Sequence, residues 1–209
     1  MIKTLINTAH NPIANFVFAH GAGAGQNSDF MQLIAEALAK QNVNVIRFNF
    51  IYMQLAHDLG KRRPPDRADK LLAHFNSVLS EIDSLYPVFI GGKSMGGRMA
   101  SMLLEESDAL GCICMGYPFH PPSKPEKLRT EHLLSINKPL LILQGERDTF
   151  GKRDEIETYK LSERVQVNYL PDGDHSFKPR KASGYSLEDN INQVIEHTAT
   201  FIKNHVKYI

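Results

Sequence analysis

The chain has 209 residues, 42 % of them hydrophobic, and its 24 basic and 23 acidic residues leave a net charge of +1. This length can bury a full core, so we expect one domain over residues 1–209. The near-zero charge and the lack of a long apolar run predict no nucleic-acid partner, no signal peptide and no membrane partner.

Strand-like and helix-like segments alternate along the chain. Apolar runs predict strands, and apolar residues at helical spacing predict helices. In chain order these are a strand at 16–19, a helix at 30–38, a strand at 43–48, a helix at 71–82, a strand at 87–90, a helix at 95–104, strands at 110–115, 140–143 and 165–170, and a final helix that opens at Ser186. Such alternation predicts a three-layer α/β sandwich, with a mostly parallel sheet of six or seven strands and helices on both faces.

The two cysteines, Cys112 and Cys114, lie two residues apart in one predicted strand. Both thiols then point to one face, which is typical of two buried small hydrophobic side chains rather than of a metal or redox site. We expect no metal, and free thiols fit a reducing, cytoplasmic compartment.

The segment Gly92-Lys93-Ser94-Met95-Gly96 has the pattern G-x-S-x-G and lies between a predicted strand and a predicted helix. This pattern places a nucleophilic serine on a tight strand-to-helix turn, where the flanking glycines leave room because they lack a Cβ. A packed Gly-Ser turn without chemistry is the alternative.

An acid and a histidine follow Ser94 in the order expected for this kind of sheet. Asp148 comes just after one predicted strand, and His175 lies in the loop after the next. Loops at the carboxyl ends of parallel strands converge, so the three residues can meet, with His175 as base and Asp148 as the acid that orients it. Three other acidic residues compete with Asp148 for this role: Glu146, Asp154 and Asp174.

A glycine-rich segment, His20-Gly21-Ala22-Gly23-Ala24-Gly25, follows the first predicted strand. A dinucleotide loop is excluded because Gln26 occupies the position of its third glycine, so no cofactor is expected. The segment instead predicts half of an oxyanion hole, with the N–H of Ala22 as one donor and that of Met95 as the other. His20 is then a structural residue that orients the loop.

Basic residues cluster in loops near these motifs and favour an anionic ester or thioester as substrate. They are Lys61, Arg62, Arg63, Lys93, Arg98, Lys178, Arg180 and Lys181. Solvated surface charge is the alternative. Nucleic-acid binding is not favoured, because Pro64, Pro65 and Asp66 interrupt the first cluster and no aromatic stacking pattern accompanies it. The candidate substrate-binding residues are Gly21, Arg98, Tyr117 and His120.

Together the segments HGAGAG, GGKSMGGR, LQGERD and DGDHSF resemble the α/β-hydrolase superfamily over residues 14–205. The closer resemblance is to a small, capless branch related to dienelactone hydrolases, which also includes testis-expressed hydrolase-like proteins and a scaffold subunit of a histone-acetyltransferase complex. It implies an α/β-hydrolase fold without a lid domain and a shallow, open pocket. Dienelactone hydrolases use a cysteine nucleophile, whereas this chain has Ser94.

The leading hypothesis is a serine hydrolase that cleaves a small, anionic ester or thioester through an acyl-enzyme, with Ser94, Asp148 and His175 as its catalytic triad. Two alternatives stay open. One is a hydrolase-fold interaction module with a vestigial triad. The other is an acyltransferase, because the same acyl-enzyme serves transfer to an acceptor other than water.

Overall fold

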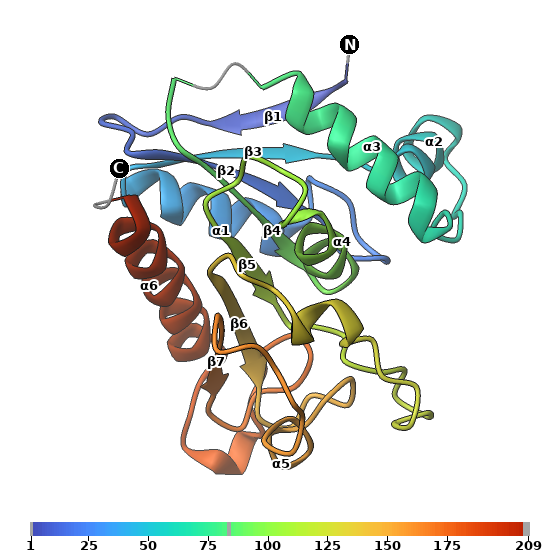
Figure 1. Cartoon of the computed structure of the whole chain (residues 1–209), viewed down its shortest axis with the longest axis vertical. Helices are drawn as coiled ribbons and strands as arrows, with labels where there is room; N and C mark the ends of the chain where they lie inside the picture. The colour runs from blue at the N-terminus through green and yellow to red at the C-terminus, as the bar shows by residue number, and fades with distance from the viewer. Residues whose placement is uncertain (1, 83–84, 207–209) are drawn as a thin grey trace.

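Apolar, strand-forming segments of the chain assemble into one sheet of seven strands (Figure 1). The computed structural model describes residues 2–82 and 85–206. The strands are β1 (Thr4–Asn7), β2 (Ala14–Ala19), β3 (Val43–Phe48), β4 (Val88–Lys93), β5 (Cys112–Met115), β6 (Leu140–Gly145) and β7 (Val165–Leu170). Their order is β1-β3-β2-β4-β5-β6-β7, and only the β1–β3 pairing is antiparallel. This confirms the prediction of a mostly parallel sheet with six or seven strands.

Helices cover both faces of the sheet. They are α1 (Asp29–Lys40), α2 (Ile51–Leu59), α3 (Ala68–Ser80), α4 (Met95–Leu103), α5 (Arg153–Ile156) and α6 (Leu187–Val206). Helices α1 and α6 contact each other on one face, and α3 and α4 contact each other on the opposite face. The three-layer sandwich is therefore confirmed, and the described residues contain no separate lid domain.

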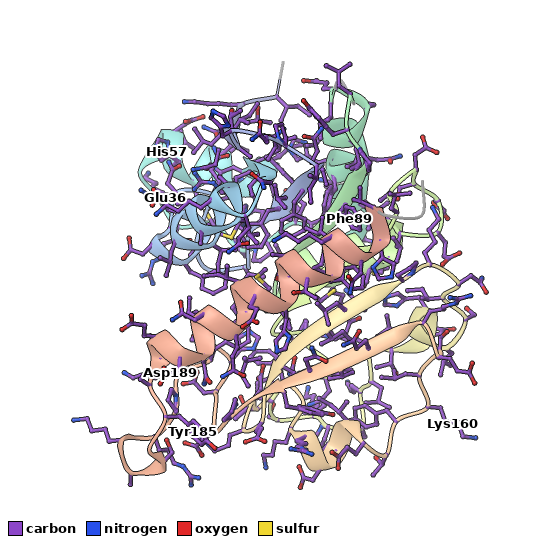
Figure 2. The ribbon with its side chains drawn as sticks, turned by 90° about the vertical axis from the view of Figure 1, so that its left-hand side faces the viewer. Glu36, His57, Phe89, Lys160, Tyr185 and Asp189 are labelled. Carbon is purple, nitrogen blue, oxygen red and sulfur yellow. The ribbon has the colours of Figure 1, made fainter. Side chains whose placement is uncertain are left out.

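Two apolar clusters, one on each side of the sheet, form the core. On one side Phe48 and Phe75 pack with ring centroids 5.0 Å apart, under α3. On the other side the ring of Phe89 in β4 lies 6.3 Å from that of Phe201 in α6. Figure 2 views the molecule from the side of α6, which runs across the sheet from Asp189 in its first turn. Burial on both faces explains why the central strands are continuous apolar runs.

Three elements, β1, α2 and α5, were not predicted from the sequence. Helix α5 is a single turn of four residues. Strand β1 is four residues long and pairs only with β3 at the edge, so Ile6 remains 61 % exposed. Helix α2 buries only Tyr52. These segments therefore carry little of the apolar periodicity that identifies an element from sequence. No helix of the described residues combines the length and apolarity needed to cross a membrane.

Cys112 and Cys114 are buried on one face of β5, as their spacing predicted, with sulfur atoms 3.7 Å apart. Burial raises the pKa of the Cys112 thiol well above its usual value. Both thiols thus pack as small core side chains.

The order of the strands reverses next to β2. The chain passes from β2 to β3 on one side, and β4 then pairs with β2 on the other side. Loops that leave β2 and β4 diverge at such a switch point, which leaves a crevice at the carboxyl ends of the strands. Residues 20–25 and Ser94 follow these two strands directly.

Candidate active site

Ser94 occupies a strained turn between β4 and α4. Its φ of 50° and ψ of −114° lie in a backbone region that residues other than glycine rarely adopt. The flanking glycines allow the turn to pack closely: a Cβ at Gly92 or at Gly96 would lie 2.5 Å from the carbonyl oxygen of Ala19. The G-x-S-x-G pattern is therefore required by packing against the end of β2.

Ser94, His175 and Asp148 form a continuous chain of hydrogen bonds. The Ser94 hydroxyl lies 2.9 Å from Nε2 of His175, and Nδ1 of the same ring lies 2.7 Å from Oδ2 of Asp148. Each residue follows a different strand, β4, β7 and β6 respectively. With Nδ1 protonated, the imidazole donates to Asp148 and accepts the serine proton at Nε2.

Asp148 is fully buried, and hydrogen bonds satisfy its carboxylate. Oδ1 accepts from the backbone N–H of Phe150 at 2.8 Å, and Oδ2 accepts from the side-chain amide of Gln144 at 3.0 Å as well as from His175. A buried carboxylate is costly unless it is paired in this way.

The three competing acidic residues have other roles in the described structure. Glu146 forms an ion pair with Arg153 at 3.0 Å. Asp174 accepts hydrogen bonds from two backbone N–H groups of its own turn. Asp154 lies exposed in the first turn of α5. Of these four acids, Asp148 contacts the imidazole of His175.

Gln144, the penultimate residue of β6, is a site residue that the sequence analysis missed. Its fully buried side chain accepts from the Tyr117 N–H at 2.8 Å. Its amide nitrogen lies 3.0 Å from Asp148 Oδ2, 3.1 Å from the Gly151 carbonyl and 3.2 Å from the Tyr117 carbonyl. It therefore joins the loop after β5 to the loop after β6, which carries the acid. A polar residue at the end of an otherwise apolar strand was the available signal.

His20 is fully buried and shapes the glycine-rich loop. Its Nε2 accepts a hydrogen bond from the Phe50 N–H at 3.0 Å, so its Nδ1 carries the proton and donates to the Gly21 carbonyl at 2.7 Å. Burial lowers the pKa of His20 to about 4, which keeps the ring neutral. The structural role predicted for His20 is thus confirmed by its contacts.

The two residues predicted to supply the oxyanion N–H groups lie on different elements near the serine: Met95 follows it directly, and Ala22 lines the same cavity as Ser94. Met95 is the first residue of α4, where an N–H has no partner within the helix. The Ala22 N–H belongs to the same trans peptide as the Gly21 carbonyl, so it points away from the buried His20 ring. Tyr52 holds the next peptide, because its hydroxyl donates to the Ala22 carbonyl at 3.0 Å.

Ion pairs hold the loop that carries His175. Asp172 has a φ of 49°. Its carboxylate forms ion pairs with the guanidinium groups of Arg180, at 2.5 Å, and Arg147, at 3.0 Å. The hydrogen bonds from Arg180 lower the pKa of Asp172 to about 2. Glu146 also accepts from the Asp172 N–H at 2.8 Å. This network anchors the loop at Asp172, three residues before His175.

A cavity of about 420 Å³ lies beside the serine. The Phe150 ring covers His175, with ring centroids 4.4 Å apart. The lining residues come from the glycine-rich loop, the start of α1, the serine turn and the loops after β6 and β7: Gly21, Ala22, Gly23, Ala24, Ser28, Phe30, Met31, Lys93, Ser94, Phe150, His175 and Ser176.

Three of the four predicted substrate-binding residues, Arg98, Tyr117 and His120, do not line the cavity. Tyr117 is fully buried in the core, where its hydroxyl donates to the Arg129 carbonyl. His120 is also buried and lies 3.3 Å from the Glu155 carboxylate. The chain after β5 turns inward and packs both side chains under the loop, away from the cavity. Gly21 does line the cavity, whereas Arg98, one turn into α4, does not.

The basic residues that cluster in the sequence lie in different parts of the folded chain. Lys61 and Arg62 border a neighbouring cavity of about 380 Å³, which shares Ser28 with the cavity beside Ser94. Arg180 is paired with Asp172. Among the basic residues named from the sequence, Lys93 is the one that lines the cavity beside the serine.

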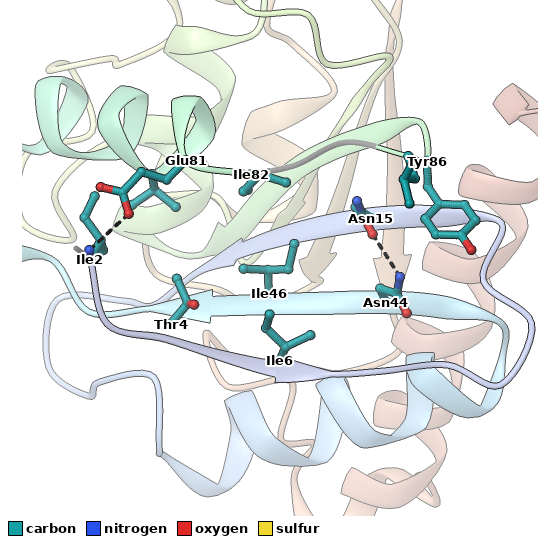
Figure 3. A pocket seen from close by; sticks show the side chains of 11 residues that line it. Ile2, Thr4, Ile6, Asn15, Asn44, Ile46, Glu81, Ile82 and Tyr86 are labelled. Carbon is teal, nitrogen blue, oxygen red and sulfur yellow. Dashed lines mark hydrogen bonds between the residues drawn. The ribbon is translucent and has the colours of Figure 1, made fainter.

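A larger hollow of about 800 Å³ lies between the sheet and the end of α3, where Ile46 and Ile82 face each other (Figure 3). Its polar contacts include the 3.0 Å hydrogen bond between Asn15 and Asn44 and the bond from the Ile2 N–H to Glu81. Ser94, Asp148 and His175 do not line this hollow, so it is separate from the candidate active site although it is larger than the cavity beside Ser94.

Comparisons with known proteins agree with this fold. The profile of the family described as "Alpha/beta hydrolase domain" matches residues 12–203. Three similar solved structures are an alpha-beta serine hydrolase homologue from Coxiella burnetii (15 % identity, 96 % of this chain and 90 % of that chain covered, TM-score 0.72), the esterase Est1E from Butyrivibrio proteoclasticus bound to ferulic acid (14 %, 97 % and 96 %, 0.71) and a dienelactone hydrolase from Anabaena variabilis (17 %, 97 % and 91 %, 0.72). At these identities the structural similarity establishes the shared fold.

Proposed function

The chain belongs to the alpha/beta hydrolase domain family, and from that membership we propose that it is a serine hydrolase that cleaves a small ester or thioester through an acyl-enzyme. The hydrogen-bond chain from Ser94 through His175 to the buried carboxylate of Asp148 carries this proposal. A serine hydroxyl bonded to a neutral imidazole that is itself oriented by a carboxylate is an activated nucleophile.

In the first half-reaction the Ser94 oxygen attacks the substrate carbonyl carbon while its proton passes to Nε2 of His175. The tetrahedral intermediate collapses with cleavage of the bond to the leaving oxygen or sulfur, which takes the proton from His175. Asp148 stabilises the imidazolium that forms in between and holds the ring in place.

In the second half-reaction a water molecule gives a proton to His175 and attacks the acyl carbon. The bond to the Ser94 oxygen then breaks, and the serine regains its proton as the acid product leaves. The N–H groups of Met95 and Ala22 donate to the oxyanion in both steps. Loss of one such donor typically costs about 3 kcal/mol of barrier.

A fluorophosphonate probe tests the proposal, because it forms a stable bond only with an activated serine. We expect the wild-type protein to be labelled at Ser94 and the Ser94→Ala variant to remain unlabelled. Ser77→Ala, which removes an exposed hydroxyl of α3, is the matched control and should label normally. An unmodified Ser94 after prolonged exposure of the folded protein, with no turnover of esters or thioesters, would overturn the proposal and favour the interaction module.

A further inference from the structure

Lys93 is the lysine among the residues that line the cavity beside Ser94, and most of the other lining residues are apolar or uncharged. The lining residues include no aspartate or glutamate, and besides His175 the only titratable side chain among them is Lys93. Much of the remaining surface comes from the glycine-rich loop and from Phe30, Met31 and Phe150. A cation at such a place favours a ligand that brings a negative charge to it.

The ammonium of Lys93 is held in one position. It donates to the His175 carbonyl at 2.5 Å, and it lies 5.2 Å from the ring centroid of Phe177 and 5.9 Å from that of Phe30. Gly116 packs against it, because a Cβ at that position would lie 2.6 Å from Nζ. A lysine confined by a carbonyl, two rings and a glycine has little freedom to swing into solvent.

The ammonium has no ionic partner within reach. In the described part of the chain no carboxylate lies within 4.0 Å of Nζ. Burial lowers the pKa of Lys93 to about 8, while the more distant Asp148 and Asp174 act to raise it. The group is therefore still charged at neutral pH, although a buried charge is costly unless it is paired. One carbonyl uses one of its three donors, so donors remain for an entering anion.

We propose that Lys93 binds a carboxylate carried on the acyl part of the substrate, a few bonds from the carbonyl that Ser94 attacks. Lys93 and Ser94 are consecutive residues and line the same cavity of about 420 Å³. One small acyl chain can therefore place its carboxylate at Lys93 and its reacting carbonyl carbon at Ser94. The preferred substrates are then half-esters or half-thioesters of short dicarboxylic acids. This inference rests on the proposed serine hydrolase function.

A pair of isosteric substrates tests it. Phenyl hydrogen glutarate carries a terminal carboxylate, and the phenyl ester of glutaramic acid carries a neutral amide of the same shape. We expect the wild-type protein to show a kcat/KM about tenfold or more higher for the glutarate, the scale of a charge-assisted hydrogen bond. In Lys93→Met this ratio should fall to about one or below, whatever the absolute rates.

Lys178→Met is the matched control, because Lys178 is an exposed lysine near His175 that does not line the cavity. It should keep the wild-type ratio. A second measurement does not depend on the variant folding: in the wild-type protein the ratio should decline as the pH rises through about 8, because Lys93 loses its charge.

The outcomes separate the two proposals. A labelled, active protein with equal kcat/KM for both esters overturns the role of Lys93 alone. Equal losses on both esters in Lys93→Met, with an unchanged ratio, also overturn it and leave Lys93 as a residue that only positions His175. Failure of Ser94 labelling together with no hydrolysis of either ester overturns the hydrolase proposal itself.

Discussion

The Tyr52 hydroxyl donates a hydrogen bond of 3.0 Å to the backbone carbonyl of Ala22, across 30 residues of sequence. Tyr52 lies in the first turn of α2 and its side chain is almost fully buried, with its ring 5.9 Å from that of His20. Together the two side chains fix consecutive peptides of the glycine-rich loop, which lines the cavity beside Ser94. Helix α2, which buries little else, thereby gains a role in shaping the site.

Tyr52→Phe should lower kcat/KM for ester hydrolysis about three- to tenfold, because it removes one hydrogen bond worth about 0.5–1.5 kcal/mol while the ring packing remains. The loss should fall mainly on kcat, since the proposed oxyanion donor, the Ala22 N–H, acts on the transition state. Steady-state kinetics on a neutral ester measures it. Tyr185→Phe, at an exposed position outside the cavity, is the control, and an equal effect in both variants would contradict a role of Tyr52 in the loop.

Gln144→Met should lower the free energy of unfolding by about 3 kcal/mol or more. The change leaves the buried Tyr117 N–H and the Gly151 carbonyl without the partner that Gln144 provides, and it removes one of the three hydrogen bonds to Asp148. Each unsatisfied buried group costs about 1–3 kcal/mol. Urea unfolding followed by circular dichroism measures the loss. Gln166→Met, at an exposed position of β7, should change stability by less than about 0.5 kcal/mol. Similar losses in the two variants would argue against this network.

Gly96→Ala should destabilise the protein by about 3 kcal/mol or prevent folding, because the added Cβ would lie 2.5 Å from the Ala19 carbonyl and 2.6 Å from that of His20. Neither backbone atom can move without shifting the end of β2. Thermal unfolding provides the measurement. Gly23→Ala adds the same methyl group where no atom lies within 4 Å, so its melting temperature should stay near that of the wild type. A wild-type melting temperature for Gly96→Ala would show that the turn is less tightly packed than described.

His20 should make stability depend on pH. Burial lowers its pKa from 6.5 to about 4 in the folded protein. Between these values the unfolded chain binds a proton that the folded chain does not, so the free energy of unfolding is highest above pH 6.5 and falls as the pH drops towards 4. Protonation of Nε2 would also break its bond from the Phe50 N–H.

Urea unfolding at pH 7.5 and at pH 4.5 tests this. The loss between the two pH values should be smaller in His20→Gln than in the wild type, because glutamine can make both hydrogen bonds but does not titrate. His10→Gln, at an exposed position, should show the full wild-type loss. Burial also lowers the pKa of His132 to about 4, and this contribution remains in all three proteins. Identical losses in wild type and His20→Gln would contradict the assignment.

The features that depend on neighbours in the chain could be predicted from the sequence. Alternating apolar segments determined the layers and the parallel sheet, because strands buried on both faces must be continuously apolar. Gly92, Ser94 and Gly96 identified the tight turn, since its geometry is a local property of five residues. The order Ser94, Asp148, His175 selected three residues that the structure joins by hydrogen bonds.

Only the tertiary structure decided which side chains face the cavity and which support it. Tyr117 and His120 follow β5 just as His175 follows β7, yet the packing of their loop buries both away from Ser94. Gln144 and Tyr52 act through contacts 27 and 30 residues away, which no local pattern encodes. The basic residues looked alike in the sequence, yet among them only Lys93 lines the cavity. Its ammonium packs against Phe30, Phe177 and Gly116, which lie far from it in the sequence. The direction of a side chain is set by what packs around it, and that is a property of the folded chain.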